Sequence, residues 1–362
     1  MIQLQDRRIV LVGGAGFIGH NLALALARGG AVVSIIDSLH VNNLLSFASA
    51  DCDRPNQDLY LAIINERLEL LKSAGIALYI QDAREQRALA KRIDDLQPQV
   101  LIHLAGVSHA QQSNSDPGNA FEHILRTLEN SLDCVRGYVE HFIYFSSSMV
   151  YGHFSNPTVT EQTPCNPLGI YGALKYAGER IVIAHHQVFD VPYTIVRPSA
   201  LYGERCVSRR VVQVFVENVL QRRDLTVHGD GTERLDFTYI DDVVHGVMRA
   251  IQHEAAKNET FNLAYGCSRS ISELIGLLQE HHPELNVVYQ SRGRLTPQRG
   301  TLCIDKARAL IGYEPGNPLE TGLRKYVRWY RTLGDLQPVK SEAEISTIAP
   351  TAASSLQPLS PA

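Results

Sequence analysis

The stretch that decides the fold is Arg8-Ile-Val-Leu-Val-Gly-Gly-Ala-Gly-Phe-Ile-Gly19, together with the run Asn21-Leu-Ala-Leu-Ala-Leu-Ala-Arg28 that follows it. The β-branched apolar run predicts a strand buried on both faces, and the alanine-leucine repeat predicts a helix. At the turn between them, Gly13 allows a tight bend, Gly16 lets the backbone approach a phosphate, and Gly19 lets the helix pack closely. Because the first N–H groups of a helix favour an anion, the stretch predicts a site for the pyrophosphate of a dinucleotide. No Gly-Lys-Ser/Thr follows, which argues against a P-loop.

The next apolar run, Ala31-Val-Val-Ser-Ile-Ile-Asp37, predicts a second strand with an acidic residue at its carboxyl end. The Asp37 carboxylate can accept hydrogen bonds from both ribose hydroxyls of NAD and would repel the extra phosphate of NADP. No arginine follows at once to accept that phosphate, so NAD is the expected cofactor. The alternative is that Asp37 only caps a helix or a turn.

Strands and helices go on alternating along the chain. A third strand is expected at 77–81 and ends at Asp82, a candidate contact for the adenine amino group. A helix is expected from Ala83 to Leu96, and a fourth strand at 100–106 ends in small residues that let a cofactor lie against the backbone. The segment between Ser38 and Gly75 is a long insertion with an amphipathic run, which fits either a lid or a partner surface.

Composition excludes several classes of protein. The chain has 362 residues and a net charge of -4 without a basic stripe, which argues against a nucleic-acid partner. We expect a cytoplasmic protein, because the sequence shows neither a signal-peptide pattern nor an apolar run long enough to span a bilayer. No residue pattern predicts a metal site. The cysteines lack a CxxC pair and are expected to be reduced; they are Cys52, Cys134, Cys165, Cys206, Cys267 and Cys303.

Two further motifs carry hydroxyl and amino groups. Phe142-Ile-Tyr-Phe-Ser-Ser-Ser148 predicts a strand that ends in three hydroxyls at the ligand-binding edge of the sheet. Tyr171-Gly-Ala-Leu-Lys175 predicts the start of a helix, and its i, i+4 spacing puts the phenol and the ammonium on one face. Such a pair is also found by chance on many helix surfaces, so it indicates a catalytic site only in combination with the other motifs.

In this order, these motifs resemble the extended short-chain dehydrogenase/reductases, specifically the NAD-dependent epimerase/dehydratase family that acts on nucleotide sugars. The likeness extends from Arg8 to about Tyr330. It implies an α/β fold with a doubly wound parallel sheet (Rossmann) and a smaller C-terminal α/β substrate domain. It also implies that the cofactor is bound by Gly13, Gly16, Phe17, Ile18, Gly19, Asp37, Asp82, Ala83, Leu104, Ala105, Gly106, Tyr171 and Lys175.

The resemblance implies a catalytic set of Ser147, Tyr171 and Lys175. The Tyr171 phenolate, favoured by the nearby ammonium and the cationic nicotinamide, would take a sugar hydroxyl proton while the carbon gives hydride to NAD. Ser147 would help to hold the developing carbonyl oxygen. Dehydratases of the family carry an Asp-Glu pair where this chain has Ser148 and Met149, so 4-epimerisation is the expected reaction. A nucleotide-sugar dehydratase is the alternative, and a non-catalytic NAD-binding sensor is the alternative from another class.

Substrate contacts are expected in the second half of the chain, with a UDP-hexose or UDP-hexuronate as the expected partner. The segment from Arg209 to Phe215 resembles the one that covers the nucleotide base, and arginines that follow could clamp the diphosphate, although each could also be an ordinary surface residue. Departures from the family pattern, such as Ala200 in place of the usual asparagine, leave the sugar open. The expected substrate residues are Ser148, Ala200, Val212, Arg234, Arg292 and Arg294.

The expected division places a cofactor domain at 1–198, to which 232–263 returns. The substrate domain is expected at 199–231 and 264–335, and a disordered tail at 338–362. By likeness to the family, helices near 120–136 and 169–186 are expected to form a homodimer.

Overall fold

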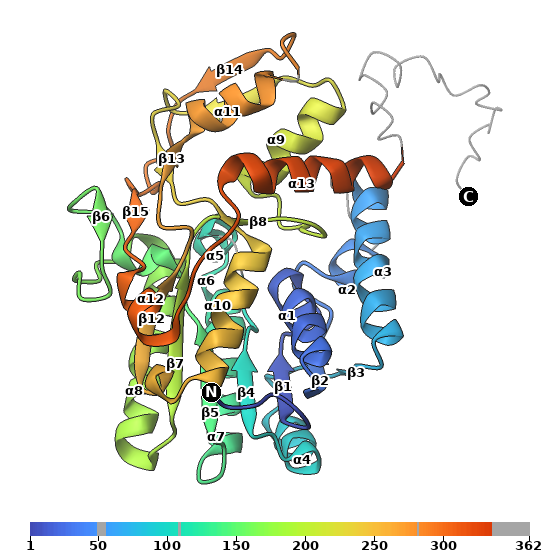
Figure 1. Ribbon diagram of the computed structural model, residues 1–362, viewed down its shortest axis with the longest axis vertical. Helices are drawn as coiled ribbons and strands as arrows, with labels where there is room; N and C mark the ends of the chain where they lie inside the picture. The colour runs from blue at the N-terminus through green and yellow to red at the C-terminus, as the bar shows by residue number, and fades with distance from the viewer. Residues whose placement is uncertain (49–55, 108–109, 281, 335–362) are drawn as a thin grey trace, which may run out of the picture.

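The computed structural model describes residues 1–48, 56–107, 110–280 and 282–334. Its centre is a sheet of seven parallel strands in the order β12-β7-β5-β4-β1-β2-β3 (Figure 1). The order reverses between β1 and β4, and their carboxyl ends therefore open a crevice at one edge. The strands are β1 (Arg8–Val12), β2 (Val32–Asp37), β3 (Ala77–Ile80), β4 (Val100–His103), β5 (His141–Phe145), β7 (Tyr193–Pro198) and β12 (Glu259–Leu263).

Helices cover both faces of this sheet. Alternate residues of β1 face opposite sides, so Ile9 and Leu11 pack in one hydrophobic core while Val10 and Val12 pack in the other. The doubly wound fold predicted from the sequence is confirmed. The first core includes α1 (Phe17–Arg28) and α10 (Ile240–Gln252), and the second includes α4 (Gln86–Leu96), α7 (Thr127–Val135) and α8 (Gly169–Phe189).

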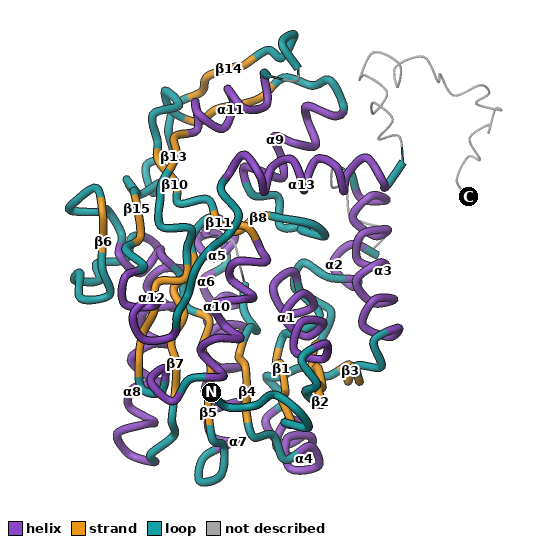
Figure 2. Tube along the Cα trace, viewed as in Figure 1, coloured by secondary structure: helices purple, strands orange, loops and turns teal. Residues whose placement is uncertain are grey.

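A smaller α/β part lies beyond the carboxyl ends of the strands, in the upper part of Figure 1. Its strands are short and pair only two by two, whereas the main sheet is continuous (Figure 2). It consists of α9 (Val211–Leu220), β9 (Leu225–His228), β10 (Arg234–Leu235), β13 (Arg269–Ser270), α11 (Ile271–Gln279), β14 (Val287–Gln290) and α13 (Leu319–Thr332). The division into two domains at the expected boundaries stays a prediction, and the expected tail at 338–362 lies outside the described residues.

Cys52 lies outside the described residues, and the other five cysteines are free thiols.

Short elements make up the remainder of the fold. The short elements are α2 (Leu44–Phe47), α5 (Ala110–Ser115), α6 (Pro117–Phe121), the π-helix η1 (Glu122–Arg126), the 3-10 helices η2 (Ser148–Tyr151) and η3 (Glu254–Ala256), α12 (Asp305–Ile311), and the strand pairs β8 (Leu201–Tyr202) with β11 (Thr238–Tyr239) and β6 (Thr158–Val159) with β15 (Thr301–Leu302).

A buried ion pair joins α8 to the central sheet. The Arg197 guanidinium at the end of β7 donates to both Glu179 carboxylate oxygens, with Nε to Oε1 at 2.8 Å and Nη2 to Oε2 at 2.6 Å. Ser146 also donates to Glu179, and Arg197 Nη1 donates to Tyr151, so the two charges are paired and hydrogen-bonded. This bidentate geometry fixes the end of β5 against α8, where the hydroxyl residues begin.

The insertion includes α2 and α3 (Gln57–Ser73), and Figure 1 shows α3 beside α1 at one side of the molecule, with its upper end near α13. Its contact with the smaller part is polar and buried: the Glu217 carboxylate of α9 accepts hydrogen bonds from Tyr60 of α3 and Tyr330 of α13, each at 2.7 Å. The insertion thus connects both parts of the molecule.

Candidate active site

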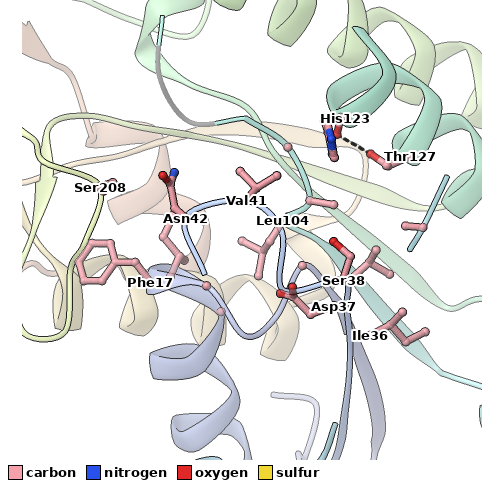
Figure 3. Close-up of a pocket in the computed structure, with 18 of the residues that line it drawn as sticks. Phe17, Ile36, Asp37, Ser38, Val41, Asn42, Leu104, His123, Thr127 and Ser208 are labelled. Carbon is pink, nitrogen blue, oxygen red and sulfur yellow. Dashed lines mark hydrogen bonds between the residues drawn. The ribbon is translucent and has the colours of Figure 1, made fainter. Parts of the chain in front are cut away.

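A cavity lies at the crevice between β1 and β4, and we call it the glycine-loop cavity (Figure 3). The glycines shape it by different means. A Cβ on Gly13, whose φ is +78°, would lie 2.5 Å from the Ala105 backbone nitrogen, and a Cβ on Gly19 would clash with the Gly14 backbone. A Cβ on Gly16 would meet only the Gly13 carbonyl, at 3.6 Å. Gly16 therefore leaves space open at the first turn of α1, whereas the other two allow close packing.

The cavity collects the sequence-predicted cofactor residues from four separate segments. All except Tyr171 and Lys175 line it, namely Gly13, Gly16, Phe17, Ile18, Gly19, Asp37, Asp82, Ala83, Leu104, Ala105 and Gly106. These residues follow the ends of β1, β2, β3 and β4, which is why they meet.

The two carboxylates of this cavity have different surroundings. Asp37 accepts backbone N–H groups from Ala15 at 2.9 Å and Leu39 at 2.8 Å, but burial raises its pKa. Asp82 is less buried, and although burial raises its pKa, hydrogen bonds from Arg84 lower it below its usual range. Both carboxylates line the cavity, and their contacts with a cofactor stay predictions.

The wall opposite the glycines comes from η1 and the start of α7. His123 and Thr127 line the cavity, and the Thr127 hydroxyl donates to the His123 carbonyl at 2.7 Å (Figure 3). The π-helix in this position was not expected from the sequence, and such turns are frequent at functional sites.

A second cavity adjoins the first, and we call it the tyrosine cavity. Ser147, Ser148, Tyr171, Lys175 and Ala200 line it, which brings together residues from β5, α8 and the loop after β7. The two cavities share Ile18, Leu104, Gly106, Leu201 and Arg210. They therefore form one continuous cleft that suits two ligands lying end to end.

Tyr171 is buried, and its phenol has a perturbed pKa. Burial raises the pKa, while the Arg210 guanidinium and a hydrogen bond from Ser147 lower it. Lys175 lines the same cavity, where its Nζ donates to the Phe145 carbonyl at 2.7 Å, and burial lowers its pKa to about 8. The cation acting on the Tyr171 phenol in this structure is Arg210.

Four of the expected substrate residues lie outside both cavities. Val212 is buried in the hydrophobic core, and Arg294 is exposed. Arg234 is paired with Glu273 at 3.3 Å and donates to Ser268, so it holds β10 against the segment before α11. Arg292 donates to the Thr296 and Pro297 carbonyls and shapes the loop that lines the tyrosine cavity.

Two arginines take the positions where those side chains were expected. Arg210 and Arg299 line the tyrosine cavity, and Arg299 is held by Glu233 at 3.5 Å. Burial lowers the pKa of Arg299, the Glu233 carboxylate raises it, and Arg210 lowers it again, so the two guanidinium groups repel each other. Arg67, from the insertion, lines the glycine-loop cavity. Their positions depend on loop paths that short sequence motifs do not encode.

Within the described ranges, no group of three or more His, Cys, Asp or Glu side chains is arranged to hold a metal ion. Within the same ranges, no helix has the length and apolarity needed to cross a membrane.

Comparison with known proteins places this cleft in a family. The chain is 28% identical over 351 residues to UDP-glucuronate 4-epimerase 1 of Arabidopsis thaliana, covering 89% of this chain and 76% of the plant protein. It is similar in structure to a tyrosine-to-phenylalanine variant of the UDP-glucuronic acid 4-epimerase of Bacillus cereus, solved with UDP-4-deoxy-4-fluoro-glucuronic acid and NAD. That match has a TM-score of 0.81, 25% identity, and coverage of 90% of this chain and 99% of the other.

A second solved structure supports the same relationship. The UDP-glucose 4-epimerase of Thermotoga maritima, solved with UDP-glucose, gives a TM-score of 0.77 and 25% identity, covering 90% of this chain and 98% of the other. The model of the NAD dependent epimerase/dehydratase family matches residues 9–264, which is most of the described chain. The chain belongs to the NAD dependent epimerase/dehydratase family.

Proposed function

We propose that the chain is an NAD-dependent UDP-sugar 4-epimerase that inverts C4 of a UDP-hexose or UDP-hexuronate through a transient 4-keto sugar. The observation that carries the proposal is the tyrosine cavity, where Tyr171, Ser147 and Lys175 meet beside the glycine-loop cavity. The activities of the Arabidopsis, Bacillus and Thermotoga relatives support the same reaction.

The glycine-loop cavity fits NAD on two observations. The open side of Gly16 leaves room for a diphosphate next to the first N–H groups of α1. Asp37 stands at the end of β2, where a carboxylate accepts ribose hydroxyls and opposes a 2′-phosphate. NAD held in this cavity would supply the hydride acceptor, and later the hydride donor, for the sugar carbon.

The residues of the tyrosine cavity move the proton. The Tyr171 phenolate would accept the proton of the C4 hydroxyl, and the phenol so formed would return that proton after the keto sugar has rotated in the cavity. Arg210 and Ser147 both lower the pKa of the phenol, against the burial that raises it, and so assist its ionisation. Ser147 would also donate to the developing carbonyl oxygen, and Lys175, anchored on the Phe145 carbonyl, would serve the nicotinamide ribose.

Substrate binding requires cations for the nucleotide diphosphate. We assign this role to Arg210 and Arg299, because both line the tyrosine cavity and repel each other there. A diphosphate between two planar guanidinium groups would relieve that repulsion and be held bidentately. The expected roles of Arg234, Arg292, Arg294 and Val212 in binding are not part of this proposal.

Epimerisation is favoured over dehydration by the lining of the tyrosine cavity. Loss of water from the keto sugar needs a further acid and base, yet no Asp or Glu of the described residues lines this cavity. Ser148 and Met149 stand where the dehydratases carry their acidic pair.

A panel assay tests the proposal. The full chain is incubated with UDP-, GDP- and dTDP-sugars, and the products are followed by NMR. Inversion at C4 of a UDP-sugar is the expected result. A deoxy-keto or alkene signal would instead assign a dehydratase, and NAD binding without turnover of any sugar would assign a non-catalytic sensor.

We also propose a homodimer, on the likeness of α7 and α8 to the family's dimer helices. The two helices pack together, and α8 leaves Val188 and Phe189 exposed near its end. Light scattering coupled to size-exclusion chromatography should give twice the chain mass of 40.2 kDa. A mass of one chain at micromolar concentration would contradict it. The cytoplasmic location stays a prediction from the sequence.

A further inference from the structure

Arg67 is a fully buried cation in the part of the chain whose role the sequence left open. It lies on α3 of the insertion, about 30 residues after Asp37, and lines the glycine-loop cavity together with the glycines of the first turn. Buried arginines are rare unless an anion accompanies them, so the surroundings of this one matter.

The guanidinium uses only part of its hydrogen-bonding capacity. Its Nε donates to the Arg205 carbonyl at 2.8 Å, and its Nη2 donates to the same oxygen. Its Nη1 is buried and has no hydrogen-bond partner. A buried donor without a partner is costly, and here it belongs to a group that lines a cavity.

Among the described residues, no carboxylate forms an ion pair with Arg67. Asp37 is the acidic residue that acts on it, but both Asp37 oxygens already accept backbone N–H groups. Burial lowers the pKa of Arg67 to about 10, and the neighbouring Arg205 guanidinium adds repulsion. Arg205 itself points to His20, at 3.2 Å, and Glu66, at 3.3 Å.

We propose that Arg67 is a phosphate ligand of the dinucleotide, with Nη1 donating to a phosphate oxygen of the adenosine half. The inference rests on the proposed placement of NAD in the glycine-loop cavity. A guanidinium is suited to this task because it can serve the Arg205 carbonyl and a phosphate through different N–H groups. The glycine loop would hold the diphosphate from one side and Arg67 from another.

The same guanidinium links the cofactor to the loop that follows β8. Arg67 holds this loop at the Arg205 carbonyl, and the next residues, Val207, Ser208 and Arg210, line the cleft. Binding of the phosphate would therefore steady the loop that presents Arg210 to the tyrosine cavity. The insertion then acts as a clamp between the two ligands.

Dissociation constants from equilibrium dialysis of the full chain test the assignment. We expect Arg67→Met to weaken NAD and ADP about 10- to 100-fold, the loss typical of a charge-assisted hydrogen bond, and to leave adenosine within about twofold. Arg205→Met is the matched control, since it removes a neighbouring guanidinium but keeps the carbonyl that Arg67 binds.

NADP distinguishes the two phosphate positions. If Arg67 contacts the diphosphate, Arg67→Met weakens NAD and NADP by the same factor. A loss confined to NADP would move the contact to the 2′-phosphate and overturn the assignment. Equal losses for ADP and adenosine would also overturn it, because they would mean that the substitution only disturbs the pocket.

Two further measurements keep the inference open to refutation if Arg67→Met folds poorly. Arg67→Lys keeps one cation, which cannot serve both acceptors with a fixed fork, and we expect an intermediate NAD affinity; an affinity equal to wild type would count against the proposal. In wild type, NAD should slow amide hydrogen exchange of residues 203–210, and Arg67→Lys should reduce that protection.

Gly16→Val separates this inference from the placement of the cofactor. The valine side chain should fill the open side of the glycine loop and abolish NAD binding. If Gly16→Val binds NAD normally, the placement itself is wrong. If it loses NAD while Arg67→Met keeps full affinity for NAD and ADP, the placement stands and the role of Arg67 fails.

Discussion

The two cavities of the cleft are formed by different parts of the chain. The glycine-loop cavity lies at the ends of four adjacent strands and the first turn of α1, where Gly13, Gly16 and Gly19 bring the backbone to its surface. The tyrosine cavity is formed by side chains from β5, α8, the loop after β7 and the segment around Arg299. Backbone held in a continuous sheet keeps its shape when side chains change, whereas a cavity of side chains can be altered one residue at a time. The first suits a constant cofactor, and the second suits a substrate that differs between relatives.

The largest effect should come from the reacting group of the tyrosine cavity. We expect Tyr171→Phe to lower turnover about 10³-fold or more, because it removes the phenolate that acts as the base in the proposed reaction, while NAD affinity changes less than about twofold. Initial rates and equilibrium dialysis measure the two quantities.

Tyr176→Phe, on the same helix but outside both cavities, is the control and should keep wild-type turnover. If Tyr171→Phe lost NAD as strongly as it lost turnover, the two cavities would not be separable in function.

The buried ion pair beneath the tyrosine cavity gives the next test. Arg197→Met leaves the Glu179 carboxylate buried without its cation, and we expect it to lower the free energy of unfolding by about 3–5 kcal/mol. Urea unfolding of the variant measures this change.

The exposed pair between Arg136 and Asp133, at 3.3 Å, supplies the comparison, since Arg136→Met should cost less than about 1 kcal/mol. Equal losses in the free energy of unfolding for the two variants would show that the buried pair stabilises the protein no more than an exposed pair does.

Substrate affinity sharpens the contrast within the smaller part. We expect Arg299→Met to raise the KM for the UDP-sugar about 10-fold or more, because it removes a charged donor from the cavity. Arg234→Met should change KM less than about twofold, since Arg234 is occupied by Glu273 and Ser268. Steady-state kinetics measure both KM values. A larger increase in KM for Arg234→Met than for Arg299→Met would assign the diphosphate contact to Arg234, as expected from the sequence.

The smallest effect concerns pH. The reaction needs the ionised form of Tyr171, so kcat should rise with pH as the phenol loses its proton. Arg210 lowers the pKa of that phenol, and Arg210→Met should therefore raise it and shift the rising limb of kcat to higher pH by up to about one unit.

At pH 7 this shift means a loss of up to about tenfold that raising the pH restores. Arg209→Met serves as the control, because Arg209 donates to Tyr60 instead, and its profile should match wild type. A loss in Arg210→Met that is the same at every pH would remove Arg210 from the electrostatics of Tyr171.

The same difference, between a cavity at strand ends and a cavity formed by side chains of several segments, explains how far the sequence could predict the site. The predicted residues of the glycine-loop cavity lie within a few positions of strand ends, so hydrophobic periodicity and the glycine spacing located the segments and the family resemblance named the residues. Ser147 was assigned by the family resemblance, and Tyr171 by its i, i+4 spacing from Lys175 together with that resemblance.

Arg67 and Arg299 were missed because no local pattern tells which way an amphipathic helix or a long loop will pack. Arg234 and Arg292 were expected to clamp the diphosphate, but the structure gives Arg234 a partner in Ser268 and Arg292 a partner in the Pro297 carbonyl. Lys175 was placed correctly along the helix, but its direction toward the Phe145 carbonyl depends on tertiary packing.

The order of strands has a consequence for biosynthesis. The outermost strand, β12, pairs with β7 although residues 199–258, which include α9 and β9 of the smaller part, separate them along the chain, and its Phe261 and Leu263 are fully buried. A nascent chain that has emerged only as far as residue 198 presents the β7 edge unpaired, with its N–H and C=O groups free to recruit another copy. The ribosome must release the segment up to residue 263 before β12 can cover that edge. Segments of the smaller part are therefore synthesised before the main sheet is complete.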